Sequence, residues 1–410
     1  MRSPDGRVRS FDRRAFLAGG ALLLACRGRE TREDGETDAA DAGAPTDTAT
    51  GTDARPTTGI ERAPFALFEA YPALAEHLPR TALGVFPSKV ERARTLLGGE
   101  RLYVKRDDDF ARAPSCPPSF APAQLYGGGK VRKLELILGE ARAQSKKRLV
   151  TFGGVGSNQA VAAAILGRAL GFEVHLYLAP QPPSTLVATN LAAMVAARAE
   201  VRVFSSVMAA QAEARRTFPP TSDVYLVPPG ATTPLGTLGF VNAGLELAGD
   251  VRAGGLPEPA RIYLALGLGG SAAGLALGCA LGGLASEIVA VRASNATTVT
   301  DATLRSIHAQ TIAFARARDA RFPAVSYEQL HLRIEPRFLG AGYGRPTAEG
   351  DAALARARAE EGWSLDPVYT GKVMAALLDD VGAPVLFWNT MSSRPLDAVP
   401  LPTELQRFTR

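Results

Sequence analysis

The sequence contains few histidines and few lysines, and its net charge is small. Its four histidines stand far apart among 410 residues, and none lies in a paired spacing, so we expect no histidine-built zinc site and no metal. Seven lysines accompany thirty-nine arginines, and the net charge is only +5. Because this charge is spread over the whole chain, it gives no indication of nucleic-acid binding.

Three cysteines are too few for a disulfide framework. Cys26 falls in the amino-terminal leader, which leaves Cys116 and Cys279 as the one available pair. Cys279 lies in an apolar run and is expected to be a small core residue rather than a nucleophile. The composition, 46% apolar and 21% charged, is globular, and the length suggests two or three lobes held by their cores.

Residues 1–26 have the layout of an export signal. The pair Arg13–Arg14 precedes an apolar run over 18–25 that ends at Cys26. The arginines resemble a twin-arginine signal, and residues 23–26 resemble a lipobox, whose cysteine is lipidated after cleavage. We expect an exported protein, either periplasmic or tethered to a membrane through Cys26; the alternative is a basic leader with an accidental apolar stretch.

Residues 27–59 differ in composition from the rest of the chain. They contain four arginines, eight acidic residues and almost no large apolar side chain. Such a segment cannot offset the entropy of ordering, so we predict a disordered linker. The folded body then begins near residue 60.

The body alternates short apolar runs with alanine-rich runs. Continuous apolar strands between helices indicate a parallel sheet that is covered on both faces. Ligands of such sheets bind at the carboxyl ends of the strands. The expected strands are 149–152, 174–178, 262–266 and 288–291, and the expected helices include 158–170 and 272–284.

Two glycine-rich turns follow expected strands. Residues 153–156 lead into Ser157-Asn158-Gln159, and residues 267–274 lead into a helix. Glycines allow close approach of the backbone, and helix-start amides bind anions, so the second turn is a candidate phosphate cradle with Ser271 adding a hydroxyl. A dinucleotide-binding turn is the competing interpretation, but Ser294 and Asn295 stand where it would need an acid. A third interpretation is that both turns serve packing alone.

Lys130 differs from its fellow lysines because three glycines precede it and a predicted helix follows it. A lysine at a helix start loses dipole stabilisation of its charged form and becomes neutral more easily. A neutral lysine is the form that condenses with an aldehyde. The alternative is an ordinary surface lysine.

Segments around these features resemble the pyridoxal-phosphate enzymes of the tryptophan-synthase-β fold, in the branch of D-cysteine desulfhydrase and 1-aminocyclopropane-1-carboxylate (ACC) deaminase. The resemblance implies a two-lobed α/β fold of type II, with mostly parallel sheets covered by helices, and pyridoxal 5′-phosphate as cofactor. Its lobes would be 131–245 and the two flanks 60–130 and 246–410, and its members are commonly homodimers. The segments that carry it are 104–108, 127–135, 156–159, 235–240, 267–274, 342–344, 365–372 and 387–390.

The resemblance also implies roles for individual residues. Lys130 would hold the cofactor's aldehyde and Asn158 its ring oxygen, with Ser157, Asn158 and Gln159 at the substrate carboxylate. Tyr343 and Tyr369 would be active-site tyrosines, against the alternative of half-buried core aromatics. The implied catalytic residues are Lys130, Tyr369, Tyr343 and Ser157, and the implied cofactor ligands are Lys130, Asn158, Gly267, Leu268, Gly269, Gly270, Ser271, Thr370 and Thr390.

Two threonines favour the desulfhydrase side of this branch. Thr370 stands where ACC deaminases carry a glutamate against the ring nitrogen, and Thr390 where they carry leucine. We therefore predict α,β-elimination from a small amino acid such as D-cysteine, giving pyruvate, ammonia and sulfide. ACC ring opening and a non-catalytic amino-acid-binding lipoprotein are the alternatives. Gly129, Asn389 and Met391 depart from the family pattern, which leaves the natural substrate and its handedness open.

Overall fold

The computed structural model describes residues 64–410 apart from 117–124, 220, 296 and 381. The predicted export signal, the linker and Cys26 lie outside the described residues. The described residues belong to one compact unit. Within the described part, no helix is both long enough and apolar enough to cross a bilayer.

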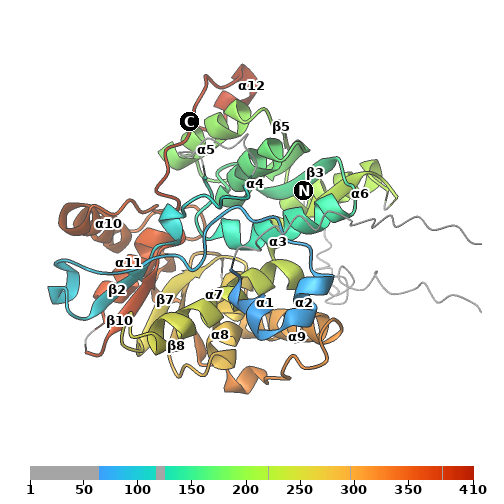
Figure 1. The fold of residues 1–410 in the computed structure, drawn as a ribbon. Coiled ribbons are helices and arrows are strands. Elements are labelled where there is room, and N and C mark those ends of the chain that lie inside the picture. Colours follow the sequence, from blue (N-terminus) through green and yellow to red (C-terminus); the bar gives the residue numbers. More distant parts are fainter. Residues whose placement is uncertain (1–63, 117–124, 220, 296, 381) are drawn as a thin grey trace, which may run out of the picture. The chain divides into compact units, whose positions relative to one another are not determined.

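This unit contains two sheets whose strands alternate with helices (Figure 1). In the larger sheet only β1 runs antiparallel to its neighbour, and every pair in the smaller sheet is parallel. The larger sheet has the order β1 (Val90–Arg92), β2 (Leu102–Lys105), β10 (Val385–Trp388), β7 (Arg261–Leu266), β8 (Glu287–Arg292), β9 (Leu332–Glu335). The smaller has the order β5 (Glu200–Val203), β4 (Glu173–Ala179), β3 (Arg148–Gly154), β6 (Val224–Val227).

The helices follow the alternation that the sequence predicts. The smaller sheet falls wholly within the range expected for the smaller lobe, and the larger sheet draws on both flanks; the lobe bounds themselves stay a prediction. The helices are α1 (Ala66–Ala70), α2 (Pro72–His77), α3 (Lys130–Ala143), α4 (Asn158–Ala169), α5 (Thr185–Ala196), α6 (Val207–Thr217), α7 (Pro234–Arg252), α8 (Gly270–Leu281), α9 (Asp301–Arg316), α10 (Ala348–Glu361), α11 (Thr370–Leu378) and α12 (Thr403–Gln406).

Local sequence explains where the helices near the strand ends begin. Ser157 caps α4, because its hydroxyl accepts a hydrogen bond from the amide of Ala160. Thr233 caps α7 in the same way, and Pro234 fits the first helical position because it has no amide to leave unpaired. These starts place helix amino termini at the carboxyl ends of parallel strands.

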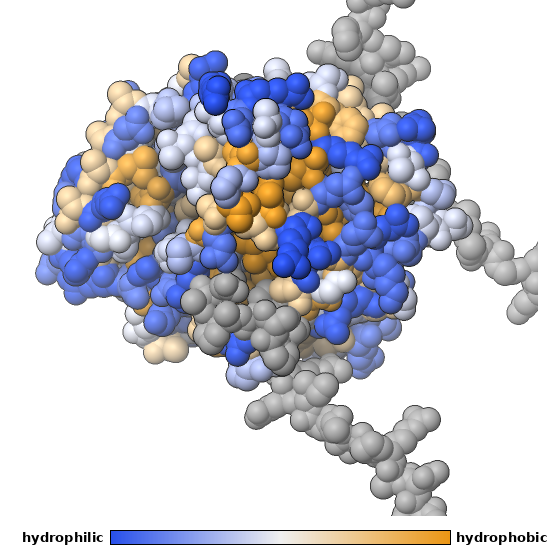
Figure 2. Space-filling model, turned by 90° about the horizontal axis from the view of Figure 1, so that it is seen from above, coloured by the Kyte–Doolittle hydropathy of each residue, from blue (hydrophilic) through white to orange (hydrophobic). Residues whose placement is uncertain are grey.

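Apolar side chains are mostly committed to the core. Cys116 and Cys279 are both free and buried, so the one available disulfide is not formed. Cys279 belongs to the core, as predicted, and burial raises the pKa of its thiol to about 12. Figure 2 shows hydrophilic residues over most of one face, with hydrophobic residues gathered near its centre.

Candidate functional site

A cavity of about 360 Å³ opens at the carboxyl ends of β3 and β7 and at the starts of α3, α4 and α8. It gathers almost all the predicted site residues from six separate parts of the chain. Those that line it are Lys130, Ser157, Asn158, Gln159, Gly267, Leu268, Gly269, Gly270, Ser271, Tyr343, Tyr369 and Thr390. Their individual roles stay predictions, but their meeting in one cavity fits them.

Lys130 is the first residue of α3, and its side chain lines the cavity. Burial lowers the pKa of its ammonium, and the carboxylate of Asp366 opposes that shift. Among the residues that the structure describes, none accepts a hydrogen bond from its Nζ. A lysine that is partly desolvated and uncommitted suits reaction with an aldehyde.

The glycines before Lys130 are required by the segment that faces them. Gly128 has a φ of +53°, and a Cβ there would overlap the carbonyl oxygen of Thr390. The amide of Gly129 donates to that same oxygen over 3.1 Å. A Cβ at Gly129 would lie 3.1 Å from both Phe240 Cζ and Thr390 Cγ2, so these two side chains leave little room for a larger residue at this position.

The turn at 267–271 has the surroundings of a phosphate cradle. Gly269 caps α8, whose first amides have no acceptor within the helix. Lys133 Nζ lies 3.1 Å from the position of a Cβ on Gly270, and it donates to the carbonyl of Gly230 over 3.2 Å. The hydroxyl of Thr232 borders the same point, and it is buried without a hydrogen-bond partner among the described residues. A bound phosphate would satisfy both groups.

Lys133 and Thr232 are functional candidates that the sequence reasoning missed. Lys133 is 2% exposed, and burial followed by the charge of Lys130 lowers its pKa well below the usual lysine value. Its spacing of three residues from Lys130 puts both on one face of α3, and that spacing could have revealed it. Thr232 precedes α7 and left no comparable pattern in the sequence.

The start of α4 offers a second anion-binding position. The hydroxyl of Ser157 accepts from its own helix and so keeps its proton free for the cavity. Gln159 Oε1 accepts from Thr151 over 3.0 Å, whereas its Nε2 is buried without a partner among the described residues. Free helix-start amides with these donors suit a carboxylate, as the sequence predicts for the substrate.

Asn158 is held in one orientation by residues distant in sequence. Asn190, fully buried on α5, donates from Nδ2 to Asn158 Oδ1 over 2.8 Å. The Nδ2 of Asn158 therefore faces the cavity, where it contacts the sulfur of Met391 at 3.7 Å. This orientation presents a donor, as the predicted contact with a ring oxygen requires.

Tyr369 and Tyr343 form a hydrogen-bonded pair at the opposite end of the sequence from Lys130. Tyr369 donates its hydroxyl to that of Tyr343 over 3.1 Å. Burial raises both pKa values, and that of Tyr369 is raised further by its neighbour. Because Tyr369 is the donor of the pair, the proton of Tyr343 is the one left free for a group in the cavity.

Thr370 is the predicted cofactor ligand that does not line the cavity. It is 1% exposed, and its hydroxyl donates to Asp366 Oδ2 over 3.0 Å. Asp366, which the sequence reasoning passed over, does line the cavity. Burial raises the pKa of Asp366, and the backbone amides of Tyr369 and Val368, which donate to its Oδ1, oppose that shift. The predicted contact of Thr370 with the ring nitrogen stays a prediction.

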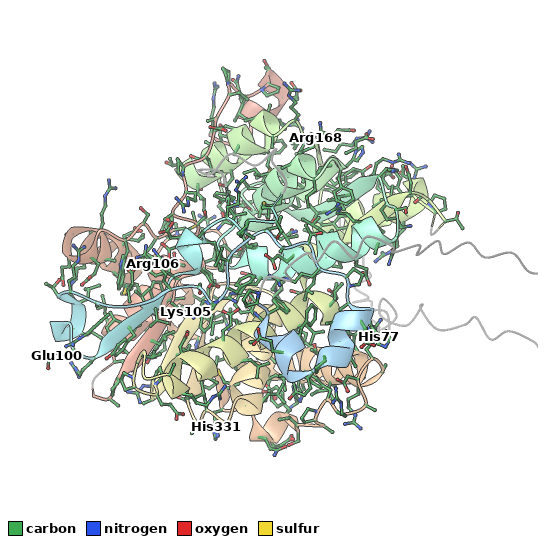
Figure 3. The ribbon with its side chains drawn as sticks, in the orientation of Figure 1. His77, Glu100, Lys105, Arg106, Arg168 and His331 are labelled. Carbon is green, nitrogen blue, oxygen red and sulfur yellow. The ribbon has the colours of Figure 1, made fainter. Side chains whose placement is uncertain are left out.

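The histidines lie outside this cavity. His77 and His331 lie on separate parts of the surface (Figure 3). His175 lies on β4, near the amino end of that strand, and does not line the cavity. There His175 Nε2 lies 3.0 Å from Glu173 Oε1, and its Nδ1 lies 2.9 Å from Glu200 Oε2. These three side chains lie close enough together to hold a metal ion, so the expected absence of a metal stays a prediction.

Comparison with known proteins gives one family and several relatives. A family model described as "Pyridoxal-phosphate dependent enzyme" matches residues 121–385. Nocardicin C-9′ epimerase of Nocardia uniformis is 31% identical over 344 residues, which cover 80% of this chain and 98% of that protein. D-cysteine desulfhydrase of Yersinia pestis is 32% identical over 324 residues, which cover 74% and 89%.

A solved structure has a similar fold. It is that of an ACC deaminase homologue, 25% identical, with a TM-score of 0.61 over 80% of this chain and 95% of the other.

Proposed function

Because the chain belongs to the family of pyridoxal-phosphate dependent enzymes, we propose that it removes a β-substituent and the amino group from a small amino acid, as a D-cysteine desulfhydrase does. The predicted family, type II fold and cofactor are confirmed. The family and its relatives also indicate an enzyme of the desulfhydrase and deaminase group rather than a non-catalytic binding protein. The substrate and the reaction are the proposed part.

The observation that carries the proposal is the presence of two acid–base systems in one cavity, Lys130 and the Tyr343–Tyr369 pair. The cofactor, when bound, supplies an electron sink that makes removal of the α-proton feasible. Lys130, with its lowered pKa, is suited to take that proton. Tyr343 stays protonated at neutral pH and is suited to protonate the leaving group.

The chain's remaining cavity residues would hold the reactants in place. Lys133, Thr232 and the turn at 267–271 would bind the cofactor's phosphate, and Asn158 its ring oxygen. The start of α4 would bind the substrate carboxylate. The resemblance places Thr370 where ACC deaminases carry a glutamate, and a threonine in that role favours elimination over ring opening, because a hydroxyl cannot keep a ring nitrogen protonated as a carboxylate can.

A screen of amino acids for keto-acid release tests the proposal. Purified enzyme with its cofactor should release pyruvate from D-cysteine and from β-chloro-D-alanine, and Tyr343→Phe should lower that release. Release of 2-oxobutyrate from ACC, with none from the β-substituted substrates, would support the deaminase instead. No keto acid from any of them would reject both.

Epimerisation is a second candidate. One relative is named an epimerase, and acid–base groups that reach the same carbon from two sides are what inversion requires. In D₂O, such an enzyme would exchange the α-hydrogen and invert the amino acid without releasing keto acid. That result would replace elimination as the main activity.

We also propose export, membrane tethering through Cys26 and a homodimeric state. The support for the first two is the arginine pair and apolar run of residues 1–26. Cell fractionation of the full chain beside Cys26→Ser tests the tether, and light scattering tests the dimer.

A further inference from the structure

Lys372 is a buried cation that the proposed mechanism does not use. It lies on α11, three residues after Tyr369, and it is 0% exposed. Its Nζ donates to the carbonyl of Leu339 over 2.8 Å and lies 3.5 Å from that of Gly342. Within the described part of the chain it forms no ion pair. A buried ammonium without a carboxylate partner costs free energy, so its contacts deserve an explanation.

Both acceptors belong to the loop that carries Tyr343. This loop runs from β9 to α10 and has little regular structure. Within the part of the chain that the structure describes, Tyr343 itself forms two hydrogen bonds. Its amide donates to Asn295 Oδ1 over 3.1 Å, and its hydroxyl accepts from Tyr369. The start of α11 therefore contacts the loop at two points. Tyr369 binds the hydroxyl of Tyr343, and Lys372 binds the backbone carbonyls that precede Tyr343.

We propose that Lys372 is a positioning residue, which fixes the backbone before Tyr343 so that the tyrosine hydroxyl stays against Tyr369 and faces the cavity. The inference rests on the proposed role of the tyrosine pair. Lys372 is not among the residues that line the cavity, so it acts through the loop and not on the reactants. Its position one helical turn from Tyr369 lets one rigid element set both tyrosines.

Lys105 provides a matched control. It is also 0% exposed and also donates to a carbonyl, that of Ser88 over 2.7 Å. Like Lys372, it does not line the cavity, but unlike Lys372 it pairs with a carboxylate, that of Asp250. Lys105→Met therefore removes a buried lysine without touching the tyrosine loop. Lys372→Met keeps an unbranched side chain one atom shorter and removes its donors, and Lys372→Gln keeps an N–H donor without the charge.

Hydrogen exchange of the cofactor-free protein reads the loop directly. In Lys372→Met, amides over 337–346 should exchange about tenfold faster or more than in the parent, and in Lys105→Met they should not. Exchange of these amides that is equal in Lys372→Met and the parent would overturn the inference. This measurement does not depend on activity.

A double-mutant cycle on the loaded enzyme then separates positioning from general destabilisation. Lys372→Met should lower kcat roughly ten- to a hundredfold with little change in KM, since small misplacements of a reacting group have effects of that size. Lys372→Gln should lose less. In a Tyr343→Phe background the same change should have almost no further effect. Equal loss in both backgrounds would mark a merely structural lysine and reject the inference.

The cycle also tests the role of the tyrosine pair separately from the role of Lys372. Full activity of Tyr343→Phe would reject the proposed role of the tyrosine pair. Loss of activity in Tyr343→Phe together with an unaffected Lys372→Met would reject the role of Lys372 alone.

Discussion

Replacement of Lys133 by methionine should change the stability of the cofactor-free protein and the affinity for the cofactor in opposite directions. Among the described residues, Lys133 Nζ donates a hydrogen bond only to the carbonyl of Gly230, and it lies 5.8 Å from the centre of the Phe240 ring. Burial lowers its pKa well below the usual value. In the cofactor-free protein, the charged form of Lys133 therefore lowers the free energy of unfolding. When the cofactor's phosphate is bound beside Gly270, the same positive charge interacts favourably with the phosphate.

The size of each effect follows from the change in burial and hydrogen bonding. Removing an imperfectly paired buried donor should stabilise the cofactor-free protein by about 1–3 kcal/mol. Losing a hydrogen bond to a charged phosphate should weaken cofactor binding by about 1.5–3 kcal/mol, or roughly ten- to a hundredfold. The pH dependence has a fixed sign. A lysine with a lowered folded pKa destabilises as pH falls from 10.5 through that pKa, and Lys133→Met should remove this dependence.

Chemical denaturation of the cofactor-free protein and titration with pyridoxal phosphate measure the two effects. Lys105→Met is the control, because it breaks a buried ion pair and should lower stability while leaving cofactor affinity unchanged. A Lys133→Met protein with lower stability and unchanged affinity would refute the reasoning and leave Lys133 as a structural lysine.

Three further predictions address neighbouring groups. Gly128→Ala should lower the free energy of unfolding, measured by denaturant, more than Gly171→Ala does. Both glycines have a positive φ, but only a Cβ at Gly128 would overlap a facing backbone carbonyl, whereas nothing lies within 4 Å of a Cβ at Gly171. Equal losses of stability would contradict this. The rate of cofactor loading should rise with pH as Lys130 loses its proton, with a midpoint below 10.5. Asp366→Asn should move that midpoint lower, because the carboxylate of Asp366 favours the charged form of Lys130. A midpoint that moves upward would reject this interaction between Asp366 and Lys130. Asn190→Asp removes the donor that fixes the side-chain amide of Asn158. It should weaken cofactor binding about 2- to 10-fold and shift the visible absorbance of the bound cofactor. An unchanged spectrum would argue against a contact between Asn158 and the cofactor's ring.

Local patterns in the sequence were sufficient for the elements that frame the cavity. The apolar run and glycines after residue 149 predict β3 and the start of α4, and the structure places α4 at Asn158–Ala169. The three glycines before Lys130 predict a turn into a helix, and α3 begins at Lys130. In each case residues adjacent in sequence determine the feature.

Contacts between distant segments could not be predicted in the same way. Asn190 lies 32 residues from Asn158, and Lys372 lies 30 residues from Gly342. Thr370 has the residue type that the family pattern needs, but its hydroxyl donates to Asp366 one turn earlier. A residue's type was readable from the sequence, whereas the direction in which its side chain points depends on packing.

The bond between Lys130 and the cofactor is the claim on which the account depends. Borohydride reduction of the loaded enzyme fixes the cofactor to the lysine that holds it, and peptide mass spectrometry then identifies that lysine. We predict the label on Lys130 alone, with none on Lys133, although both line the cavity. A label on Lys133, or on no lysine, would contradict the account.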